Sequence, residues 1–566
     1  MEQTPHPIHR IGVIGGGQLA WMMGPAAQKI GLDLVVQTPH QSDPAVAIAQ
    51  STLLAPVDDV AATAALATQC DVITFENEFI DCEGLEAIAG RGAIFRPSLD
   101  VLALVLDKRY QREFFSRIGL PNPRYNFLEG NESEAELMDK AQAIGFPLVI
   151  KTRRLGYDGY GTSVVKDASQ LSSTWKNFDR APVLLEEFVP FKQELAVMVA
   201  RSSAGEVAVY PTVETQQVSQ TCRRVFAPAR SSPAVAASMN SVARTLVEAL
   251  QLVGIVGIEC FLNQDDQVLI NEIAPRTHNS GHYTLDACAT SQFEQQLRAV
   301  SDRPLGPVSL TCSQAVMVNL LGLEEDEAAH HQKLKALKQL PNATLYWYNK
   351  GLRPGRKLGH ITQILGAETD PADAAKGIEA LWYGPYSSTL STLMPYTLDQ
   401  LNAMTEAKFV AAIGPAFEDT PSIAAQVWSQ RPFASVSDLH RRMADIVQAM
   451  TAEEKLTLIK AHPDLGTRVT MAEASVKEQS KAGLHNLSLE EYQQFERLNQ
   501  AYKDRFDFPF ILAVAGHTKA SILKKLALRS RNSTVEEMAT ALVQIELIAR
   551  SRLEIWVQDR SDPNIF

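Results

Sequence analysis

The segment YGPYSSTLSTLMPYT, from Tyr383 to Thr397, divides this chain of 566 residues into two parts with different patterns. Its glycine, prolines and serines are typical of a linker between domains. Before it, β-rich runs alternate with helical stretches, whereas after it the pattern is helical throughout. We therefore predict two structurally unrelated units in one chain.

The part before the linker shows two kinds of strand pattern. Short runs such as IGVIG, LDLVVQ and DVITF alternate with helices over residues 10–100, which is typical of a parallel α/β sheet. From residue 145 to 275 the strands are longer and hairpin-like, which predicts a mixed α+β domain. The predicted multidomain order is an α/β domain at 1–100, an α+β domain at 101–300, a small β-rich domain at 301–385, a linker at 386–396 and an all-α domain at 397–566.

Capping-box patterns mark helix starts beyond the linker. In each, a serine or threonine stands three residues before a glutamate or glutamine, so that the pair can satisfy exposed main-chain N–H groups. They are Thr397–Gln400, Thr451–Glu454, Ser488–Glu491 and Ser533–Glu536.

The composition favours a protein that acts on small molecules. The formal net charge of −12 argues against nucleic-acid binding, because such proteins usually carry a basic excess. No apolar run approaches the length of a membrane span, and the first residues lack the apolar core of a signal peptide. The six cysteines form no CxxC pair, which fits a reducing compartment. We expect a cytoplasmic protein without nucleic-acid or membrane partners.

The first glycine-rich turn is a candidate phosphate site. Gly15, Gly17 and Ala20 follow a strand with the spacing G-x-G-x-x-A, which lets main-chain N–H groups approach an anion at a helix start. A dinucleotide fold would also need an acidic residue about 20 positions on, where this chain has Gln37 and Thr38. We therefore favour the phosphate of another ligand over NAD.

A second glycine-rich segment follows the strand FPLVIKT. Lys151 ends this strand and can place a positive charge on the oxygens of a triphosphate. The loop after it contains Gly156, Gly159 and Gly161. An ordinary glycine-rich hairpin is the alternative interpretation. Downstream, LLEEFV offers Glu186 and Glu187 as a clamp for adenine and ribose.

The hairpin GIECFLNQDDQVLINEI places two carboxylates opposite each other. If its turn is centred between Asp265 and Asp266, paired residues have numbers that sum to 531, as those of Glu259 and Glu272 do. Facing carboxylates destabilise a bare sheet, but they suit two side chains that share a hard cation such as Mg²⁺. The hairpin therefore predicts a metal site, and a solvated strand end is the alternative.

The motifs of the first part together resemble the ATP-grasp ligases, and within them the N5-carboxyaminoimidazole ribonucleotide synthetases of purine biosynthesis. These motifs, within residues 8–385, are GGGQL, TFENEF, Asp107–Lys108, KTRRLGYDGYG, LLEEFV, GIECF, INEIAPRTHNSGH and LRPGRKLGH. The resemblance implies a Rossmann-like pre-ATP-grasp domain, an ATP-grasp domain and a small C-terminal domain. It also implies that ATP and bicarbonate form carboxyphosphate, whose carbon is captured by the exocyclic amine of aminoimidazole ribonucleotide.

The resemblance assigns roles to matching residues. Glu259 and Glu272 would hold Mg²⁺, expected as two ions, on the nucleotide. The catalytic residues that would meet bicarbonate at the γ-phosphate are Arg276, His278 and Asn279. The ATP-binding residues would be Lys108, Lys151, Gly156, Gly159, Glu186, Glu187 and Glu194. The ribonucleotide-binding residues would be Gly17, Gln18, Leu19, Glu76, Tyr157, Asp158, Arg353 and Lys357.

Three residues depart from the family pattern. Trp21, Leu155 and Tyr160 stand where relatives often read GQLxRM, RRGGYD and GYDGKG. Phosphate contacts or loop mobility can differ at these positions. A sibling family that uses formate tends to carry aspartate where Asn279 stands, which favours bicarbonate here.

Two residues of the helical part stand out by position. His462 precedes Pro463, so its helix must end there, and its ring can point inward; a structural histidine is the alternative. Arg552 lies on the core face of the last helix, because the other residues of its stripe are Ile545, Ile548, Ala549 and Trp556. A buried guanidinium requires an anion. The candidates for that anion are Glu478, Asp464 and a carboxylated substrate.

The motifs AHPDLG, SVKEQSKAGL, LNQAYKDRFDFPFILAV and QIELIARSRLEIW, within residues 396–558, resemble the family of 2-oxo-4-hydroxy-4-carboxy-5-ureidoimidazoline (OHCU) decarboxylases. This family ends urate breakdown toward S-allantoin without a cofactor. The resemblance makes His462 the general acid/base, with Glu478 and Arg552 also catalytic. The residues that would bind the ureidoimidazoline are Pro463, Ser475, Gln479, Phe510, Ile511, Leu512, Ala513 and Val514. Asp507 and Gly516 depart from the family pattern, in which FGFPF is more usual than FDFPF.

Together the two resemblances predict a bifunctional enzyme, a ligase that builds purines joined to a lyase that degrades them. Its partners would be small molecules: aminoimidazole ribonucleotide, bicarbonate and ureidoimidazoline. ATP and Mg²⁺ would serve the first part and no cofactor the second, and we expect a homodimer. In one alternative the helical part is only a docking or dimerisation module. In another the first part uses a different acceptor acid.

Overall fold

The computed structural model describes residues 7–154, 161–178, 180–218, 221–323, 327–351, 355–384, 396–418, 420–462, 465, 489–514 and 519–558. Apart from the three residues Asn177–Asp179, one compact unit ends at Gly384 and a second begins at Pro385. This division falls within the predicted linker segment. None of the helices in these ranges is both long and apolar enough to cross a membrane.

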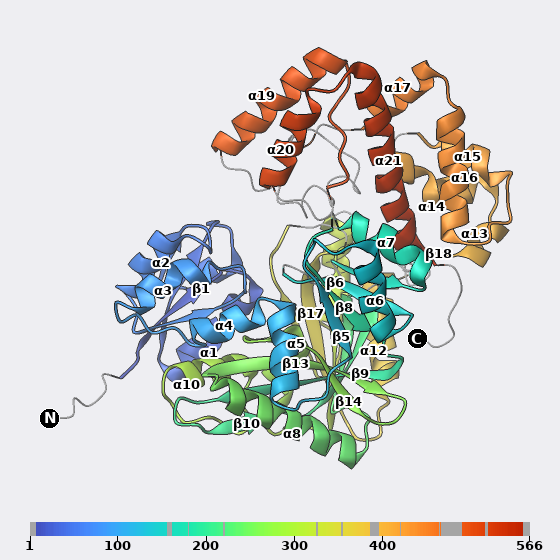
Figure 1. Ribbon diagram of the computed structural model, residues 1–566. Coiled ribbons are helices and arrows are strands. Elements are labelled where there is room, and N and C mark those ends of the chain that lie inside the picture. The colour runs from blue at the N-terminus through green and yellow to red at the C-terminus, as the bar shows by residue number, and fades with distance from the viewer. Residues whose placement is uncertain are drawn as a thin grey trace. The chain divides into compact units, whose positions relative to one another are not determined.

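A parallel sheet forms the N-terminal part of the first unit (Figure 1). Its strand order is β3-β2-β1-β4, and all neighbours are parallel, as the sequence predicted. The strands are β1 (Arg10–Ile14), β2 (Asp33–Thr38), β3 (Ser51–Leu54) and β4 (Val72–Phe75). The helices that follow them in the chain are α1 (Gln18–Ile30), η1 (Pro44–Ala47), α2 (Val60–Ala67), α3 (Cys82–Ala89) and α4 (Leu99–Val105).

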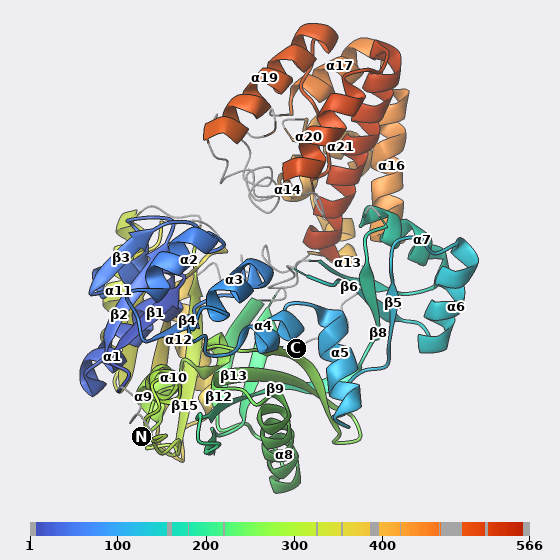
Figure 2. The same cartoon turned by 60° about the vertical axis from the view of Figure 1, so that its left-hand side comes forward.

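A small antiparallel sheet has the order β5-β8-β6-β7. Its strands are β5 (Tyr125–Leu128), β6 (Leu148–Thr152), β7 (Thr162–Val165) and β8 (Val183–Glu187). The helices α6 (Glu134–Ile144) and α7 (Ala168–Asn177) lie on one side of it (Figure 2). The chain enters this sheet from α5 (Lys108–Arg117).

A larger, nine-stranded sheet carries the predicted metal-binding residues Glu259 and Glu272, together with Glu194 and Lys357. Its order is β14-β13-β9-β11-β12-β15-β17-β16, and β10 pairs with β9. The strands are β9 (Phe191–Arg201), β10 (Val207–Val209), β11 (Val213–Val218), β12 (Thr221–Ala227), β13 (Gly254–Asn263), β14 (Val268–Ala274), β15 (Gln314–Leu321), β16 (Ala343–Trp347) and β17 (Lys357–Leu365). The strands of the predicted 301–385 domain therefore continue this sheet, and the boundary at residue 300 does not separate two sheets.

Two of the remaining helices of the first unit share apolar cores with elements described above. Apolar residues of α8 share a core with β9, β13 and β14, and residues of α10 share one with α1. The remaining helices are α8 (Pro233–Leu250), η2 (Asn279–Gly281), α9 (Thr284–Ala287), α10 (Gln292–Val300), α11 (Glu327–Leu337) and α12 (Pro371–Tyr383).

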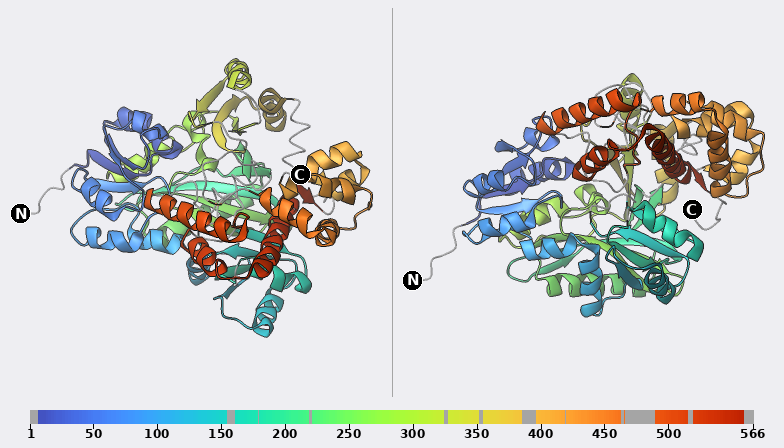
Figure 3. Two further views of the ribbon diagram at one scale, coloured as in Figure 1. Left: turned by 90° about the horizontal axis from the view of Figure 1, so that it is seen from above. Right: turned by 45° about the horizontal axis from the view of Figure 1, so that its top comes forward.

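The second unit consists of helices around a single apolar core, coloured orange to red in Figure 3. Its helices are α13 (Leu398–Ala403), α14 (Glu406–Ile413), η4 (Gly414–Phe417), α15 (Ser422–Trp428), α16 (Val436–Ala449), α17 (Ala452–Lys460), α19 (Leu489–Phe506), α20 (Lys519–Arg529) and α21 (Thr534–Trp556). One short parallel pair, β18 (Tyr396–Thr397) with β19 (Val557–Gln558), joins its two ends, so the unit is not purely helical. The capping boxes predicted at Thr397, Thr451 and Ser533 are confirmed, and Ser488 lies outside the described residues.

Candidate active sites

The glycine-rich turn after β1 lies against a carboxylate. Glu76 follows β4, and its Oε1 accepts a hydrogen bond of 3.3 Å from the main-chain N–H of Leu19 in the first turn of α1. A Cβ atom on Gly17 would lie 2.3 Å from the same oxygen, so only glycine permits this approach. The N-terminus of α1 therefore faces a negative charge within the protein itself.

Lys350 extends this region, although the sequence-based prediction missed it. Its ammonium donates a hydrogen bond to Oε1 of Gln18. Burial, with the positive charge of Arg356, lowers the pKa of Lys350 to about 8. Lys350 lies outside the LRPGRK motif, which is why the motif did not reveal it. Lys357 begins β17, whereas Arg353, Tyr157 and Asp158 lie outside the described residues.

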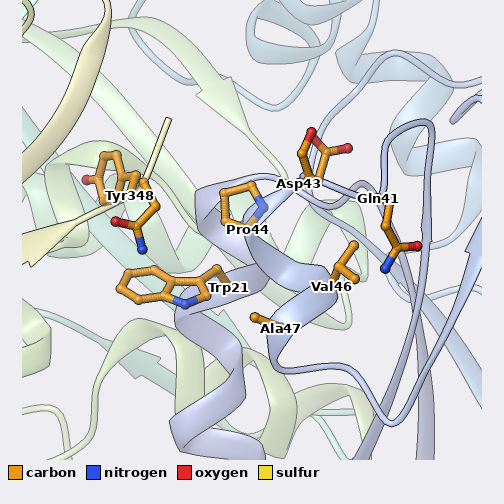
Figure 4. Close-up of a pocket in the computed structure, with 9 residues that line it drawn as sticks. Trp21, Gln41, Asp43, Pro44, Val46, Ala47 and Tyr348 are labelled. Carbon is orange, nitrogen blue, oxygen red and sulfur yellow. The ribbon is translucent and has the colours of Figure 1, made fainter. Parts of the chain in front are cut away.

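Trp21, which departs from the family pattern, lines a cavity of about 280 Å³ one helical turn from Gln18. Figure 4 shows its indole below Pro44 and beside Tyr348. The Trp21 and Tyr348 rings meet edge to face with centroids 6.4 Å apart. The remaining lining residues are Gln41, Ser42, Asp43, Val46, Ala47 and Asn349.

The predicted pairing of Glu259 with Glu272 is confirmed, but the predicted turn is not. Pairs near the turn, such as Phe261 with Leu269, have numbers that sum to 530, because three residues rather than two form the turn. A β-bulge adds Asn271 to β14 and restores the sum of 531 at the two glutamates. The sequence carried the signal, since Asn271 and Glu272 break the alternation of Val268 and Ile270.

Two lysines bind carboxylates at or beside this pair. Nζ of Lys108 lies 3.0 Å from Oε2 of Glu272, and its charge holds the pKa of that carboxyl well below its usual range. Nζ of Lys151 lies 2.6 Å from Oε2 of Glu186 and donates a hydrogen bond of 3.1 Å to Oδ1 of the bulge residue Asn271. The bulge therefore ties the strand of Lys151 to the carboxylate pair.

Glu186 is a buried counter-ion in this structure. Burial raises the pKa of its carboxyl, but the opposing charges of Arg112 and Lys151 hold it at about 2. Arg112, on α5, also donates a hydrogen bond of 2.6 Å to the carbonyl of Asn271. No motif marks Arg112, and sequence reasoning missed it.

The other ATP-binding candidates differ in exposure. Glu187 lies 2.9 Å from Arg124 at the surface. Glu194, on β9, has its pKa raised to about 7, chiefly by burial. Gly156 and Gly159 lie outside the described residues.

The loop after β14 brings the three predicted catalytic residues together. Nε of Arg276 lies 2.8 Å from Glu78, and Nε2 of His278 lies 3.5 Å from Oε1 of Glu259. Burial, with the charge of Arg276, lowers the pKa of His278 to about 3, so its ring is neutral near pH 7. The amides of Asn279 and Asn319 exchange two hydrogen bonds, of 3.0 and 2.7 Å.

His462 is buried at the end of α17. Its Nδ1 lies 2.9 Å from the carbonyl oxygen of Leu458, which can only accept a hydrogen bond. In the neutral ring, Nδ1 therefore carries the proton and Nε2 does not. The predicted partners Pro463, Ser475, Glu478 and Gln479 lie outside the described residues.

The predicted pocket segment is held by polar side chains of helices α20 and α21. Four of its residues are buried: Phe510, Ile511, Leu512 and Val514. Arg529 donates a hydrogen bond of 2.7 Å to the carbonyl of Ile511, and Gln544 accepts one of 3.0 Å from the N–H of Ala513. Glu537 in turn binds Arg529 at 2.9 Å. Sequence reasoning did not find this Arg529–Glu537 pair.

Arg552 is buried as predicted, and one of its partners, Glu418, is not among the three predicted candidates. Nη2 donates a hydrogen bond of 2.7 Å to Oε1 of Glu418, and both side chains are 2% exposed. Nη1 donates one of 3.0 Å to the carbonyl of Pro415. The predicted anions were Glu478, Asp464 and a carboxylated substrate. Glu418 lies 134 residues from Arg552 in the sequence, so no local pattern indicates their contact. Asp464 and Glu478 lie outside the described residues.

The main-chain conformation at Asp507 explains why glycine is usual at this position in the family and why aspartate can replace it. It has a φ of 63°, a left-handed conformation in which glycine is unstrained and aspartate is tolerated. Its carboxylate lies 2.8 Å from Nζ of Lys460 on α17. Gly516 lies outside the described residues.

Among residues whose placement is described, no group of three or more His, Cys, Asp or Glu side chains is arranged to hold a metal by itself. The Glu259–Glu272 pair offers two carboxylates, which fits Mg²⁺ that is shared with substrate phosphates rather than enclosed by protein.

Four protein-family models match successive segments that together cover most of the chain. Residues 8–105 match the ribonucleotide synthetase preATP-grasp domain, and residues 113–293 match the ATP-grasp domain. Residues 315–381 match the phosphoribosylaminoimidazole carboxylase C-terminal domain, and residues 402–554 match OHCU decarboxylase.

Several relatives match two thirds of the chain or more. N5-carboxyaminoimidazole ribonucleotide synthase of Synechococcus elongatus is 51% identical over 387 residues, 67% of this chain and 97% of that protein. Phosphoribosylaminoimidazole carboxylase of Ogataea methanolica is 37% identical over 419 residues, 73% of this chain and 76% of that protein.

Solved structures resemble the same part of the chain. The N5-carboxyaminoimidazole ribonucleotide synthetase of Thermotoga maritima has a TM-score of 0.57 at 37% identity, covering 66% of this chain and 98% of that one. The carboxyaminoimidazole ribonucleotide synthase of Aspergillus clavatus, complexed with ATP, has a TM-score of 0.61 at 33% identity, covering 66% and 97%. The chain therefore belongs to the N5-carboxyaminoimidazole ribonucleotide synthase family of ATP-grasp ligases and carries an OHCU decarboxylase domain at residues 402–554.

Proposed function

We propose that the first unit carboxylates the exocyclic amine of 5-aminoimidazole ribonucleotide, using ATP and bicarbonate. The observation that carries this proposal is the facing pair Glu259 and Glu272, with Lys108 at 3.0 Å from Glu272 and His278 at 3.5 Å from Glu259. Cation-binding carboxylates, a phosphate-binding lysine and a polar loop are thereby brought to one place.

Mg²⁺ would be held by Glu259 and Glu272 and would neutralise phosphate charge on the nucleotide. Lys108 and Lys151 would contact phosphate oxygens, while Glu272 and Glu186 keep their ammonium groups in place. Gln18, Glu76 and Lys350 would hold the ribonucleotide beside the start of α1.

The chemistry proceeds in two displacements. An oxygen of bicarbonate takes the γ-phosphoryl group of ATP, which gives carboxyphosphate and ADP. The amine nitrogen then bonds to the carboxyl carbon as the C–O bond to phosphate breaks and the amine loses a proton. Arg276 and Asn279 can hold the anionic oxygens, and the neutral His278 can accept or donate a hydrogen bond. Exclusion of water protects carboxyphosphate until the amine is aligned.

The test follows ADP and carboxylated product with each substrate omitted in turn. We expect coupled turnover only when Mg²⁺, bicarbonate and the ribonucleotide are all present. Glu272→Gln should abolish turnover, because one negative charge leaves the cation site. Full turnover by Glu272→Gln, or equal turnover with formate in place of bicarbonate, contradicts the proposal.

We infer that the second unit decarboxylates OHCU to S-allantoin without a cofactor. The observation that supports this is the buried His462, whose Nδ1 contact with Leu458 leaves Nε2 as the nitrogen that exchanges a proton. Nε2 of His462 would first take up a proton from the substrate or from water. Loss of CO₂ leaves an electron pair that the adjacent C=N bond of the substrate accepts, and the protonated ring then returns the proton to the substrate. Because Glu418 neutralises Arg552, the arginine would bind a substrate anion as part of an ion pair. The homodimer and the cytoplasmic location stay predictions.

A further inference from the structure

Helix α10 contains three glutamines that are fully buried. Gln292, Gln295 and Gln296 each have 0% exposure. Glutamine is seldom fully buried, because a primary amide inside a protein costs free energy unless its donors and acceptor are all satisfied. Each of the three binds a specific partner, and the partner of Gln292 belongs to the proposed carboxylation site.

Gln292 holds the main chain of His278 in both directions. Its Oε1 accepts a hydrogen bond of 2.9 Å from the N–H of His278, and its Nε2 donates one of 2.8 Å to the carbonyl of the same residue. A main-chain N–H can only donate, so this arrangement fixes which end of the amide is oxygen.

The second N–H of the Gln292 amide points to the imidazole ring of His282. Nε2 of Gln292 lies 3.0 Å from Nδ1 of His282. Burial lowers the pKa of His282 well below its ordinary value, so the ring is neutral and its Nδ1 accepts this hydrogen. Both N–H donors and the oxygen acceptor of the Gln292 amide therefore form hydrogen bonds to residues that follow β14.

Strand β13 also restricts the position of His278. A Cβ atom on Gly257 would lie 2.7 Å from Cβ of His278, so the strand permits the histidine only because this position is glycine. The side chain of His278 reaches Glu259, at 3.5 Å, and the next residue, Asn279, pairs with Asn319. A shift of the His278 main chain would therefore move both side chains relative to the carboxylate pair.

We propose that Gln292 is a positioning residue of the carboxylation site, which sets the place of His278 and Asn279 by gripping the main chain of His278. This inference rests on the proposed function of the first unit. Gln292 would not contact substrate. The ATP-binding lysines lie on α5 and β6, so their positions do not depend on Gln292.

Gln295 provides a matched control three residues along the same helix. Its Nε2 donates a hydrogen bond of 2.9 Å to the carbonyl of Gly306, and its Oε1 accepts one of 2.9 Å from the N–H of Gly306. Both amides bind the main-chain N–H and carbonyl of one residue and both are fully buried, although only Gln292 also reaches a histidine ring. Gly306 is not a predicted site residue. A glutamate at either position keeps the acceptor, removes the donor and buries the same carboxyl group.

The experiment compares Gln292→Ala, Gln292→Glu and Gln295→Glu with the wild-type full chain. For both Gln292 variants we expect kcat for carboxylation to fall roughly 10²-fold, the scale of a misplacement of about 1 Å. Their KM for ATP should stay near the wild-type value, because Lys108 and Lys151 do not depend on Gln292. Gln295→Glu should keep the wild-type kcat once activity is corrected for the folded fraction, which circular dichroism and thermal unfolding report.

The inference is overturned if Gln292→Glu retains as much kcat per folded molecule as Gln295→Glu, or if its loss appears only in the KM for ATP. Gln292→Glu decides the matter if Gln292→Ala does not fold, because the control carries the same buried glutamate. A wild-type enzyme that makes no carboxylated product contradicts the proposed function instead.

Discussion

Lys350 is a residue whose protonation should be visible in substrate binding. Burial and the charge of Arg356 lower its pKa to about 8, so a rise in pH from 7 to 9 removes the cation that binds Gln18. At one pH unit above its pKa only about a tenth of a group stays protonated. We expect the KM for the ribonucleotide to rise severalfold across this range.

Lys350→Arg is the matched control, because arginine stays charged up to pH 12 or above. The KM of this variant should change little between pH 7 and 9, when ATP and bicarbonate are saturating. A KM of the wild type that is flat over the same range would exclude Lys350 from ribonucleotide binding.

Glu418 should be essential to the stability of the helical unit. Its carboxylate neutralises a guanidinium that is 2% exposed, and removal of one partner of such a pair typically costs about 3–5 kcal/mol. We expect Glu418→Gln to lower the free energy of unfolding of this unit by that amount, as measured by urea denaturation. The double variant Glu418→Gln with Arg552→Met should recover part of the loss, because no buried charge is left alone. Equal stability of Glu418→Gln and wild type would refute this role.

Arg552 and Glu418 also show why part of the site could not be predicted. The helical period of α21 placed Arg552 inward, and the structure confirms it. The partner could not be inferred, because contact between two residues 134 positions apart depends on how η4 packs against α21. Arg112 and Lys350 escaped prediction for the same reason, because their partners Glu186 and Gln18 lie 74 and 332 positions away. Arg529 and Glu537 are only eight residues apart, but they lie on two different helices, α20 and α21.

At the scale of elements, local patterns predicted the strands and helix starts correctly, but they did not predict the turn that sets the register of the hairpin. The parallel strands and three capping boxes follow from period and spacing, and they are confirmed. The pairing of Glu259 with Glu272 was predicted from a turn that does not form, and it is correct only because the Asn271 bulge compensates. Hairpin register inferred from a turn centre therefore needs a check against the alternation of apolar residues.

The capping box at the start of α21 should contribute measurably to the stability of the helical unit. The Ser533 side chain accepts a hydrogen bond from the N–H of Glu536, whose carboxylate accepts one from the N–H of Ser533. Ser533→Ala should cost about 1 kcal/mol of unfolding free energy. Urea denaturation of the full chain, followed through the helical signal, measures this, and Ser533→Asp should retain most of the stability because aspartate also caps helices.

At the scale of the whole molecule, the two units should differ in their need for a metal. The first unit offers a facing carboxylate pair next to lysines, and the second offers a histidine whose tautomer is fixed by a helix carbonyl. We therefore expect EDTA to stop ATP-dependent carboxylation and to leave ureidoimidazoline decarboxylation unchanged in the same preparation. Loss of both activities, or of neither, would show that the division of chemistry between the units is wrong.

His462→Asn should remove the second activity alone. His462 lies just past the end of α17, at a helix terminus where asparagine is tolerated, so the fold should survive. Decarboxylation should fall by roughly 10²-fold or more, the usual scale for loss of a positioned acid/base, while carboxylation by the first unit serves as the internal control. The measurement follows the decay of freshly generated ureidoimidazoline optically against a blank for its spontaneous decomposition. If the wild type does not exceed the blank, the helical unit is a docking or dimerisation module. If the wild type exceeds the blank and His462→Asn matches it, His462 is not the acid/base of this reaction.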